Sequence, residues 1–268
     1  MRLTHPQATF RGVPAEDTFF AADDRQIQLG TGYIIPCVQQ EMYPARPLNL
    51  SIEIEAQPSA RSMLFGALLA RAEVLRGQYP GMPARLYTQL DVKNADMAAF
   101  YQRCGLKMDD AEDLFYFQLP YAAIGKTPMG VQYASVPLEN DAQQDAFLQR
   151  LNAMRITPIQ RDQLTLWREQ PGFLALGFYR SGRPVCELLT AGTGTQAMLI
   201  AVYTRSEFRN QGMAKQLINQ ASAILRERGM EGMYAYIFRR NTPQVALMQG
   251  LNANFVRTTA LLPGIDLT

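Results

Sequence analysis

The stretch RNQGMAKQLINQA, residues 209–221, runs from a charged turn around a glycine directly into a segment with helical spacing of apolar residues. A helix start leaves four backbone N–H groups without intrahelical partners, and the aligned peptide dipoles make it partly positive. A Ser or Asp cap would satisfy part of this need. The sequence instead places Gly212 there, where the missing Cβ lets an anion approach the backbone. The stretch therefore predicts a helix whose N-terminus is capped by a phosphate group.

The segments around this turn predict a regular order of strands and helices from residue 130 onward. Apolar residues recur at helical spacing in residues 139–154 and again in residues 161–169. Three apolar strands joined by tight glycine turns follow, namely GFLALGFY, PVCELLT and QAMLIAVYT. The full predicted order is strand, two helices, three strands, helix, strand, helix, strand. This order indicates an α+β domain with a mostly antiparallel sheet.

The composition narrows the classes of function. The chain has 268 residues, 47% of them hydrophobic and 19% charged, which fits two ordinary globular domains. The formal net charge is only +2 and the charges are scattered, so we expect no nucleic-acid partner. The sequence contains neither a signal-peptide-like start nor an apolar run of membrane-spanning length. We therefore expect no membrane partner and a cytoplasmic location.

The cysteine and histidine content argues against several kinds of site. The three cysteines, Cys37, Cys104 and Cys186, are far apart and odd in number, which fits buried free thiols better than disulfides or a metal site. The single histidine, His5, lies close to the first residue. Histidine-dependent hydrolase mechanisms and multi-histidine metal sites are therefore disfavoured, and we expect no bound metal.

Taken together, the R-x-x-G-x-A turn, the strand before it and the strand–helix–strand after it resemble the GNAT superfamily of N-acetyltransferases. The resemblance covers nearly all of residues 130–260. It implies an acetyl-CoA fold in which the fourth and fifth strands splay apart around the pantetheine. By this resemblance, the backbone of Val202, Tyr203 and Thr204 would bind the pantetheine. The pyrophosphate would be held by Arg209, Asn210, Gln211, Gly212, Met213, Ala214 and Lys215. Asn241 would either reach the pantetheine or cap the next helix.

The first half resembles the same family in a degenerate form. NADMAAFYQRCGL, residues 94–106, is similar to the family's fourth-helix segment. In the preceding helix, Arg61 aligns with Arg209, but Leu64 stands where the close-approach glycine should be. We therefore expect two tandem GNAT-like domains, each a mixed, mostly antiparallel sheet flanked by helices. Residues 1–125 would form a degenerate domain, and residues 126–268 would form the domain that binds acetyl-CoA.

The catalytic groups of the second half are harder to assign. Met248 stands where the family often has a tyrosine acid, and Met198 where several members have a glutamate. If Thr193-Gly194 is a two-residue hairpin loop, Glu187 lies opposite Ile200 and borders the cleft as a possible base; the alternative is a solvated strand glutamate. Tyr234 or Tyr236 could protonate the leaving thiolate, with Tyr236 our choice, although core or rim tyrosines are the common alternative.

These observations predict an N-acetyltransferase that moves an acetyl group from acetyl-CoA to an amine of a small molecule or peptide. The sequence identifies neither the acceptor nor the oligomeric state. A non-catalytic CoA-binding sensor or scaffold remains an alternative, and Met198 and Met248 favour it. A plain interaction protein without a nucleotide site is a third.

Overall fold

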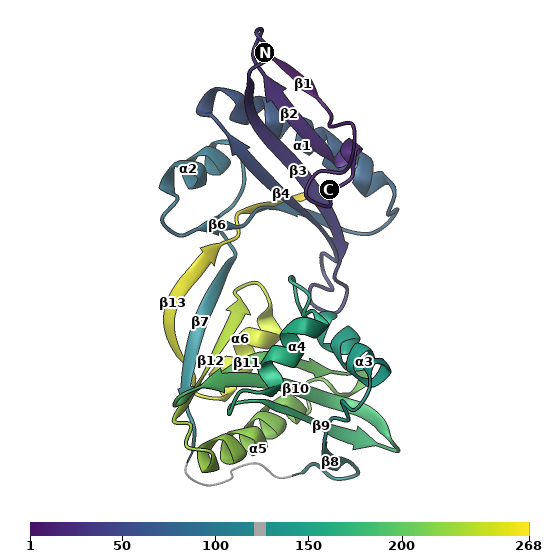
Figure 1. The fold of residues 1–268 in the computed structure, drawn as a ribbon, viewed down its shortest axis with the longest axis vertical. Helices are drawn as coiled ribbons and strands as arrows, with labels where there is room; N and C mark the ends of the chain where they lie inside the picture. Colours follow the sequence, from purple (N-terminus) through teal and green to yellow (C-terminus); the bar gives the residue numbers. More distant parts are fainter. Residues whose placement is uncertain (121–126, 268) are drawn as a thin grey trace. The chain divides into compact units, whose positions relative to one another are not determined.

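The computed structural model describes residues 1–120 and 127–267 (Figure 1). Its contacts divide the chain into two compact units, one made of Met1–Ala111 with Ala260–Thr268 and the other of Glu112–Thr259. The strands form two sheets that contain both parallel and antiparallel pairs, with helices packed against them. The predicted α+β class with two mixed, mostly antiparallel sheets flanked by helices is confirmed.

The first unit is built on a six-stranded sheet. Across this sheet the strands are β1 (Arg2–Thr4), β2 (Thr18–Ala22), β3 (Gln28–Val38), β4 (Leu48–Ala56), β5 (Ala84–Tyr87) and β14 (Gly264–Leu267). Its helices are the short η1 (Ala15–Asp17), α1 (Pro58–Gly77) and α2 (Ala95–Arg103). The pair β4–β5 is parallel, and the other pairs are antiparallel.

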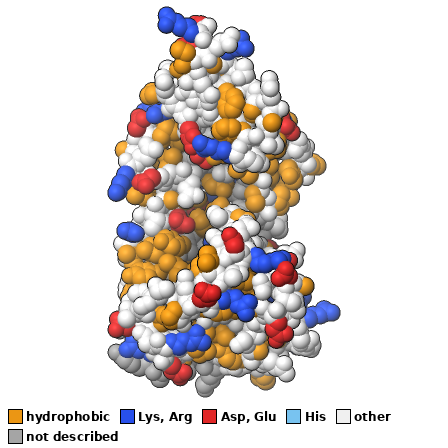
Figure 2. Space-filling view, viewed as in Figure 1, with side chains coloured by type: hydrophobic (Ala, Val, Ile, Leu, Met, Phe, Trp, Pro, Cys, Tyr) orange, Lys and Arg blue, Asp and Glu red, His pale blue; other side chains and the backbone are white. Residues whose placement is uncertain are grey.

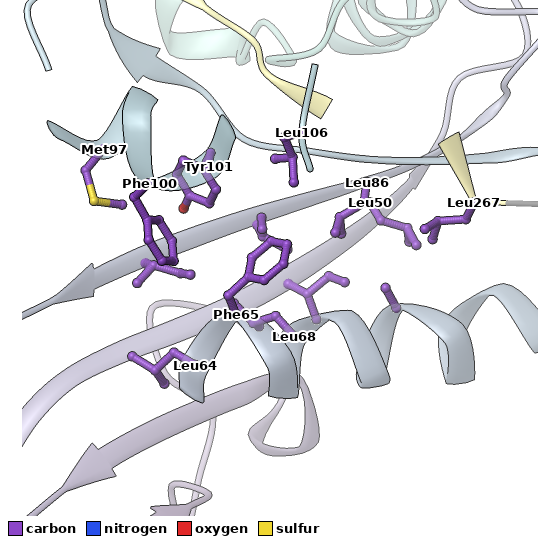
Figure 3. Packing of buried hydrophobic residues seen from close by; sticks show 14 of the residues in the cluster. Leu50, Leu64, Phe65, Leu68, Leu86, Met97, Phe100, Tyr101, Leu106 and Leu267 are labelled. Atoms are coloured by element: carbon purple, nitrogen blue, oxygen red, sulfur yellow. The ribbon is translucent and has the colours of Figure 1, made fainter. Parts of the chain in front are cut away.

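The core of the first unit fills the space between α1, α2 and the sheet (Figure 3). Leu64, Phe65 and Leu68 of α1 are buried there, as are Phe100 and Tyr101 of α2. The three aromatic rings pack edge to face, with centroids 5.2 to 6.2 Å apart. These side chains therefore hold both helices on the sheet.

The second unit carries most of an eight-stranded sheet. Its strands are β7 (Ala111–Gln118), β8 (Gln132–Ser135), β9 (Leu174–Arg180), β10 (Arg183–Thr193), β11 (Gln196–Thr204), β12 (Gly232–Phe238) and β13 (Asn254–Leu261). Its helices are α3 (Asp141–Asn152), α4 (Arg161–Arg168), η2 (Ser206–Phe208), α5 (Met213–Glu227) and α6 (Thr242–Gly250). The predicted order of elements from residue 130 is confirmed as far as β13, whereas β14 was not predicted.

The two faces of this sheet carry different helices. Leu217 and Ile218 of α5 pack with Leu199, Ala235 and Ile237 of the strands. On the other face, helices α3 and α4 share a second apolar cluster with alternate residues of the same strands. Because successive residues of a regular strand point to opposite faces, the residues of β12 alternate between the α5 face and the opposite face.

The two halves of the sequence exchange strands. In the eight-stranded sheet the order is β6-β13-β7-β12-β11-β10-β9-β8, where β6 is the two-residue strand Leu90–Asp91. Strand β7, from the first half, thus lies between β12 and β13 of the second half (Figure 1). In return β14, at the end of the chain, pairs with β5 of the first half.

The exchange changes how the predicted domains are divided. The predicted boundary between residues 125 and 126 divides the sequence into two repeats, and this division stays a prediction. The boundary itself lies within residues 121–126, which are outside the described residues. The compact units divide instead at Ala111/Glu112 and at Thr259/Ala260. The physical reason is that β7 finds its hydrogen-bond partner on β12, and a local pattern of residues does not encode this choice.

Two strand-like stretches of the first half do not form single strands. The strand-like stretch FRGV is a tight turn closed by a Phe10–Val13 bridge, with Arg11 and Gly12 at positive φ. The stretch RLYTQLDV is split between β5 and β6, which belong to different sheets. In the second half the charged side chains of both signs are scattered over the face seen in Figure 2, in keeping with the small net charge.

Candidate functional site

A pocket opens where β11 and β12 separate. These parallel strands pair over four residues, from Gln196↔Gly232 to Leu199↔Ala235, and both continue beyond this register, to Thr204 and Phe238. The pocket has a volume of about 660 Å³, within the range of small-molecule sites. It is lined by residues of β11 from Met198 onward, by residues of β12 from Ala235 onward, and by α5 and α6. All of its lining residues belong to the second unit.

The turn at residues 209–212 forms one wall of this pocket. Asn210 and Gly212 both have positive φ, 60° and 75°, and Gly212 stands at the N-cap of α5. No side chain makes a capping hydrogen bond there, as expected from the sequence. A Cβ on Gly212 would meet nothing within 4 Å, so the space in front of the helix start is open. The backbone therefore presents the N-terminus of α5 to the pocket, an arrangement suited to an anion.

Most of the predicted CoA-binding residues line the pocket. These are Val202, Thr204, Arg209, Asn210, Gly212, Met213, Ala214 and Lys215. Tyr203, Gln211 and Asn241 do not line it. The Tyr203 side chain packs on the α3–α4 face, and the Gln211 side chain donates to the carbonyl oxygen of Glu207. Arg209 donates from Nε to the carbonyl oxygen of Thr204, 3.1 Å away, which ties the turn to the end of β11.

Asn241 acts as a helix cap. Its side-chain oxygen accepts from the backbone N–H of Gln244 at 3.2 Å, and only 1% of the residue is exposed. The capping alternative considered for this residue is confirmed. The equivalent residue of the first half, Asn94, caps α2 in the same way.

The hairpin β10–β11 has a different register from the predicted one. The turn is Gly194-Thr195 rather than Thr193-Gly194, since Thr193 pairs with Gln196. In addition, Leu189 pairs with Ala201 while Thr190 pairs with Leu199, which leaves Ile200 as an extra residue in β11. This β-bulge shifts the alternation of β11, and Ile200 and Ala201 both pack toward the α3–α4 face. Ile200 lies at the point where the two strands separate.

As a result, the predicted position of Glu187 is wrong. Glu187 lies opposite Tyr203, not Ile200, and it does not line the pocket. It is fully buried, and its carboxylate accepts two hydrogen bonds from Arg150 of α3, at 2.5 and 2.9 Å. Tyr179 donates a third at 3.3 Å. Burial, and to a lesser extent the nearby charge of Glu187, raises the pKa of Tyr179 strongly. This arrangement ties α3 to the sheet. Glu187 does not border the cleft, which was the reason for considering it as a base.

Tyr236, by contrast, lies in the pocket. It is 45% exposed, lies on β12 just past the last residue paired with β11, and lines the pocket. Met198 also lines it. Met248 is buried at 1% exposure and lines the pocket from α6. Tyr236 therefore supplies a phenol hydroxyl at the mouth of the strand separation.

The sequence reasoning missed Glu112. Four charged residues line the pocket, namely Glu112, Arg155, Arg209 and Lys215, so Glu112 is the single carboxylate among the described lining residues. It lies on β7, opposite Phe238 of β12. Its Oε2 accepts from the hydroxyl of Thr259 at 2.8 Å. The local sequence offers no signal for this placement, because it depends on β7 joining the sheet of the second half.

The first half has no counterpart of the glycine turn. Only Gln57 separates β4 from α1, whereas eight residues, 205–212, separate β11 from α5. The predicted alignment of Arg61 with Arg209 is therefore wrong, because Arg61 lies inside α1 and pairs with Asp96. Leu64 is fully buried in the core and faces no open anion site. The turn is missing altogether, rather than being blocked by Leu64.

Residues 1–120 and 127–267 offer no metal site built from side chains. Their His, Cys, Asp and Glu residues form no group of three or more that could hold a metal ion. No helix in this part of the chain has the length and apolar character that a membrane span requires.

Comparison with known proteins gives a family match within the second half. Residues 144–252 match the model of the Acetyltransferase (GNAT) family. The chain is similar in fold to a GCN5-related N-acetyltransferase from Sphaerobacter thermophilus, with a TM-score of 0.50 at 14% identity over 96% of this chain and 82% of that one. No curated protein matches the sequence significantly.

Two longer structures have slightly higher TM-scores. A GCN5-related N-acetyltransferase from Anabaena variabilis gives 0.52 at 12% identity, over 95% of this chain and 63% of that one. A conserved protein from Enterococcus faecalis, described as a probable N-acyltransferase, gives 0.54 at 11% identity, over 92% of this chain and 61% of that one. At these identities the likeness establishes a GNAT fold.

Proposed function

Because residues 144–252 match the GNAT acetyltransferase family, we propose that the protein transfers an acetyl group from acetyl-CoA to an amine. The observation that carries the proposal is the pocket between β11 and β12, closed at one end by the uncapped start of α5. The pyrophosphate of CoA would take the place of the missing cap. Arg209 and Lys215 line the same wall and would offset its charge.

The remaining parts of acetyl-CoA would follow from this anchor. The pantetheine would lie along the edge of β11 that β12 leaves open, near Val202 and Thr204. The thioester would then reach the bulge at Ile200, where backbone N–H groups would stabilise the oxyanion that forms during attack. Positioning of the two reactants would supply much of the remaining rate enhancement.

The chemistry would be direct attack of a neutral amine on the thioester carbon. The tetrahedral intermediate then expels the CoA thiolate, and the hydroxyl of Tyr236 would give that thiolate its proton. Because a thiolate is a good leaving group, the loss of this one acid would slow the reaction without abolishing it.

A non-catalytic sensor or scaffold is the second candidate function. The buried Met248 favours it, because helix α6 offers no hydroxyl at the position where the family pattern has its tyrosine. Under this candidate, CoA would bind in the same pocket without turnover.

A paired experiment tests the two candidates. Calorimetric titration with CoA measures binding, and release of the CoA thiol from acetyl-CoA measures turnover against a panel of primary amines. Binding with amine-dependent thiol release supports the transferase. Binding without release against any amine favours the sensor, and no binding at all would reject both.

A further inference from the structure

Glu112 comes from the first half of the sequence, yet it lines the pocket of the second. Antiparallel partners point their side chains to the same face of a sheet, so Glu112, Phe238 and Leu114 share a face with Tyr236. Ala235 and Ile237 alternate with these residues and pack on α5. The carboxylate of Glu112 therefore belongs to the face of the sheet opposite α5.

The same face carries an apolar wall of the pocket. This wall consists of Ile156, Pro158, Ile159, Trp167, Met198 and Ile200. They come from the α3–α4 connection, from α4 and from β11. If CoA occupies the wall made by the start of α5, this second wall is open to the acceptor.

The carboxylate of Glu112 has two polar neighbours, Thr259 and Arg155. Thr259 donates to its Oε2 and fixes the carboxylate at the edge of β13. Burial lowers the pKa of Arg155, and the carboxylate of Glu112 opposes this shift, so the two charges lie within electrostatic reach. The guanidinium of Arg155 donates to the carbonyl oxygens of Ile200 and Thr157. Glu112 thus lines the same pocket as Arg155, whose guanidinium reaches the bulge where β11 and β12 separate.

Resting on the function proposed above, we propose that the acceptor is an apolar primary amine and that Glu112 binds its ammonium group and removes a proton from it. The apolar body of the acceptor would lie against Trp167, Met198 and Ile200. A carboxylate beside an apolar wall attracts a cation that carries an apolar chain and offers little to a polar or anionic acceptor.

The proton balance is complete. Glu112 takes one proton from the R–NH₃⁺ acceptor, and the neutral nitrogen then forms a bond to the thioester carbon. The C–S bond breaks as the carbonyl reforms, and the thiolate takes a proton from Tyr236. The nitrogen of the product loses its second proton to solvent, and the Tyr236 phenolate is reprotonated from solvent. Glu112 also passes its proton to solvent. Solvent thus receives two protons and returns one to Tyr236, so the net release is one proton.

The test compares Glu112→Gln with a matched control, Glu169→Gln. Glu169 is an exposed carboxylate at the end of α4 and does not line the pocket. CoA affinity and melting temperature are measured for the wild type and both variants. Thiol release from acetyl-CoA is measured with 2-phenylethylamine and hexylamine as apolar acceptors and with ethanolamine as a polar one.

We expect the wild type to prefer the apolar amines. Glu112→Gln should lower kcat/KM for them by about 10²-fold or more at pH 7, as for loss of a general base, with CoA affinity unchanged. This defect should shrink as the pH approaches the pKa of the amine, about 10 for an alkylammonium, because the acceptor then arrives already neutral. Glu112→Asp should retain part of the activity, and Glu169→Gln should match the wild type.

Other outcomes would overturn the inference. A Glu112→Gln variant within about twofold of wild type, or with a defect of equal size at every pH, would leave Glu112 with a structural role only. Preference for ethanolamine, or no transfer to either apolar amine by a wild type that binds CoA, would reject the apolar acceptor. Failure of the wild type to bind CoA would instead reject the proposed function itself.

Discussion

Replacement of Gly212 by alanine tests whether the turn before α5 receives the pyrophosphate of CoA. Gly212 has φ 75° and ψ 5°, a left-handed conformation that costs an L-residue about 1–2 kcal/mol. A Cβ there meets no atom within 4 Å, so steric clashes add nothing to this cost in the unliganded protein. Gly212→Ala should therefore fold and melt a few degrees lower, at about 2–4 °C per kcal/mol.

The effect on CoA should be larger than the effect on stability. The new methyl group would occupy the open space in front of the α5 N-terminus, where the pyrophosphate is proposed to approach. Loss of two charge-assisted hydrogen bonds, at about 1.5–3 kcal/mol each, corresponds to a 10²-fold or greater loss of affinity, since about 1.4 kcal/mol is tenfold. Calorimetric titration with CoA measures this loss directly.

The same helix offers a matched control. Gly229, just past the end of α5, has φ 83°, and a Cβ added to it would also meet no atom within 4 Å. Gly229→Ala should therefore lower stability by a similar amount and leave CoA affinity unchanged. Equal losses of affinity in Gly212→Ala and Gly229→Ala would attribute the effect to stability alone. Wild-type affinity in Gly212→Ala would show that the phosphate does not approach this turn.

Three other features of the molecule can be tested in the same protein: the missing turn of the first half, the buried Glu187 and two buried tyrosines. Because Gln57 alone joins β4 to α1, titration should give one CoA per chain, and two would contradict the loss of the site in the first half. Glu187→Gln should lower the free energy of unfolding by about 1–3 kcal/mol by leaving Arg150, whose side chain is 27% exposed, without its carboxylate, and an unchanged denaturant midpoint would contradict this structural role. Burial raises the pKa of Tyr87 and of Tyr101 to about 12, so the folded state resists their ionisation. The free energy of unfolding should therefore fall from pH 10 to about pH 12, by about 1.4 kcal/mol per pH unit for each tyrosine. An ultraviolet titration in which both phenols ionise near pH 10 in the folded protein would refute this.

Local patterns predicted the second half well because each of its elements is specified over a short stretch. The apolar spacing of α5 and the glycine at its start lie within 13 residues, RNQGMAKQLINQA. The cap at Asn241 is likewise a property of three neighbouring residues, Asn241-Thr242-Pro243. Most of the pocket wall next to α5 could therefore be named from the sequence.

Register and strand partnership were not predictable in this way. The position of Glu187 required counting back from a hairpin turn, and a turn shifted by one residue together with a bulge at Ile200 changed its partner from Ile200 to Tyr203. A bulge is set by contacts on both faces of the sheet, including the bond from Arg155 to the carbonyl of Ile200, rather than by the local pattern. The carboxylate of Glu187, predicted as a base in the cleft, is instead bound by Arg150 of α3.

Through the exchange of strands, the first half contributes a strand to the sheet that carries the site, although it has no phosphate turn of its own. Strand β12 forms one wall of the pocket, and on the side away from β11 its partner is β7, over seven residue pairs from Gly232↔Gln118 to Phe238↔Glu112. Without β7, that edge of β12 would present unpaired backbone groups, and β13 would lose its neighbour in the sheet. The stretch 126–268 therefore lacks one strand of its own sheet, although it contains residues 144–252, which match the family model. What the first half supplies is the strand that completes the sheet, and with that strand comes Glu112, the single carboxylate among the described residues that line the pocket.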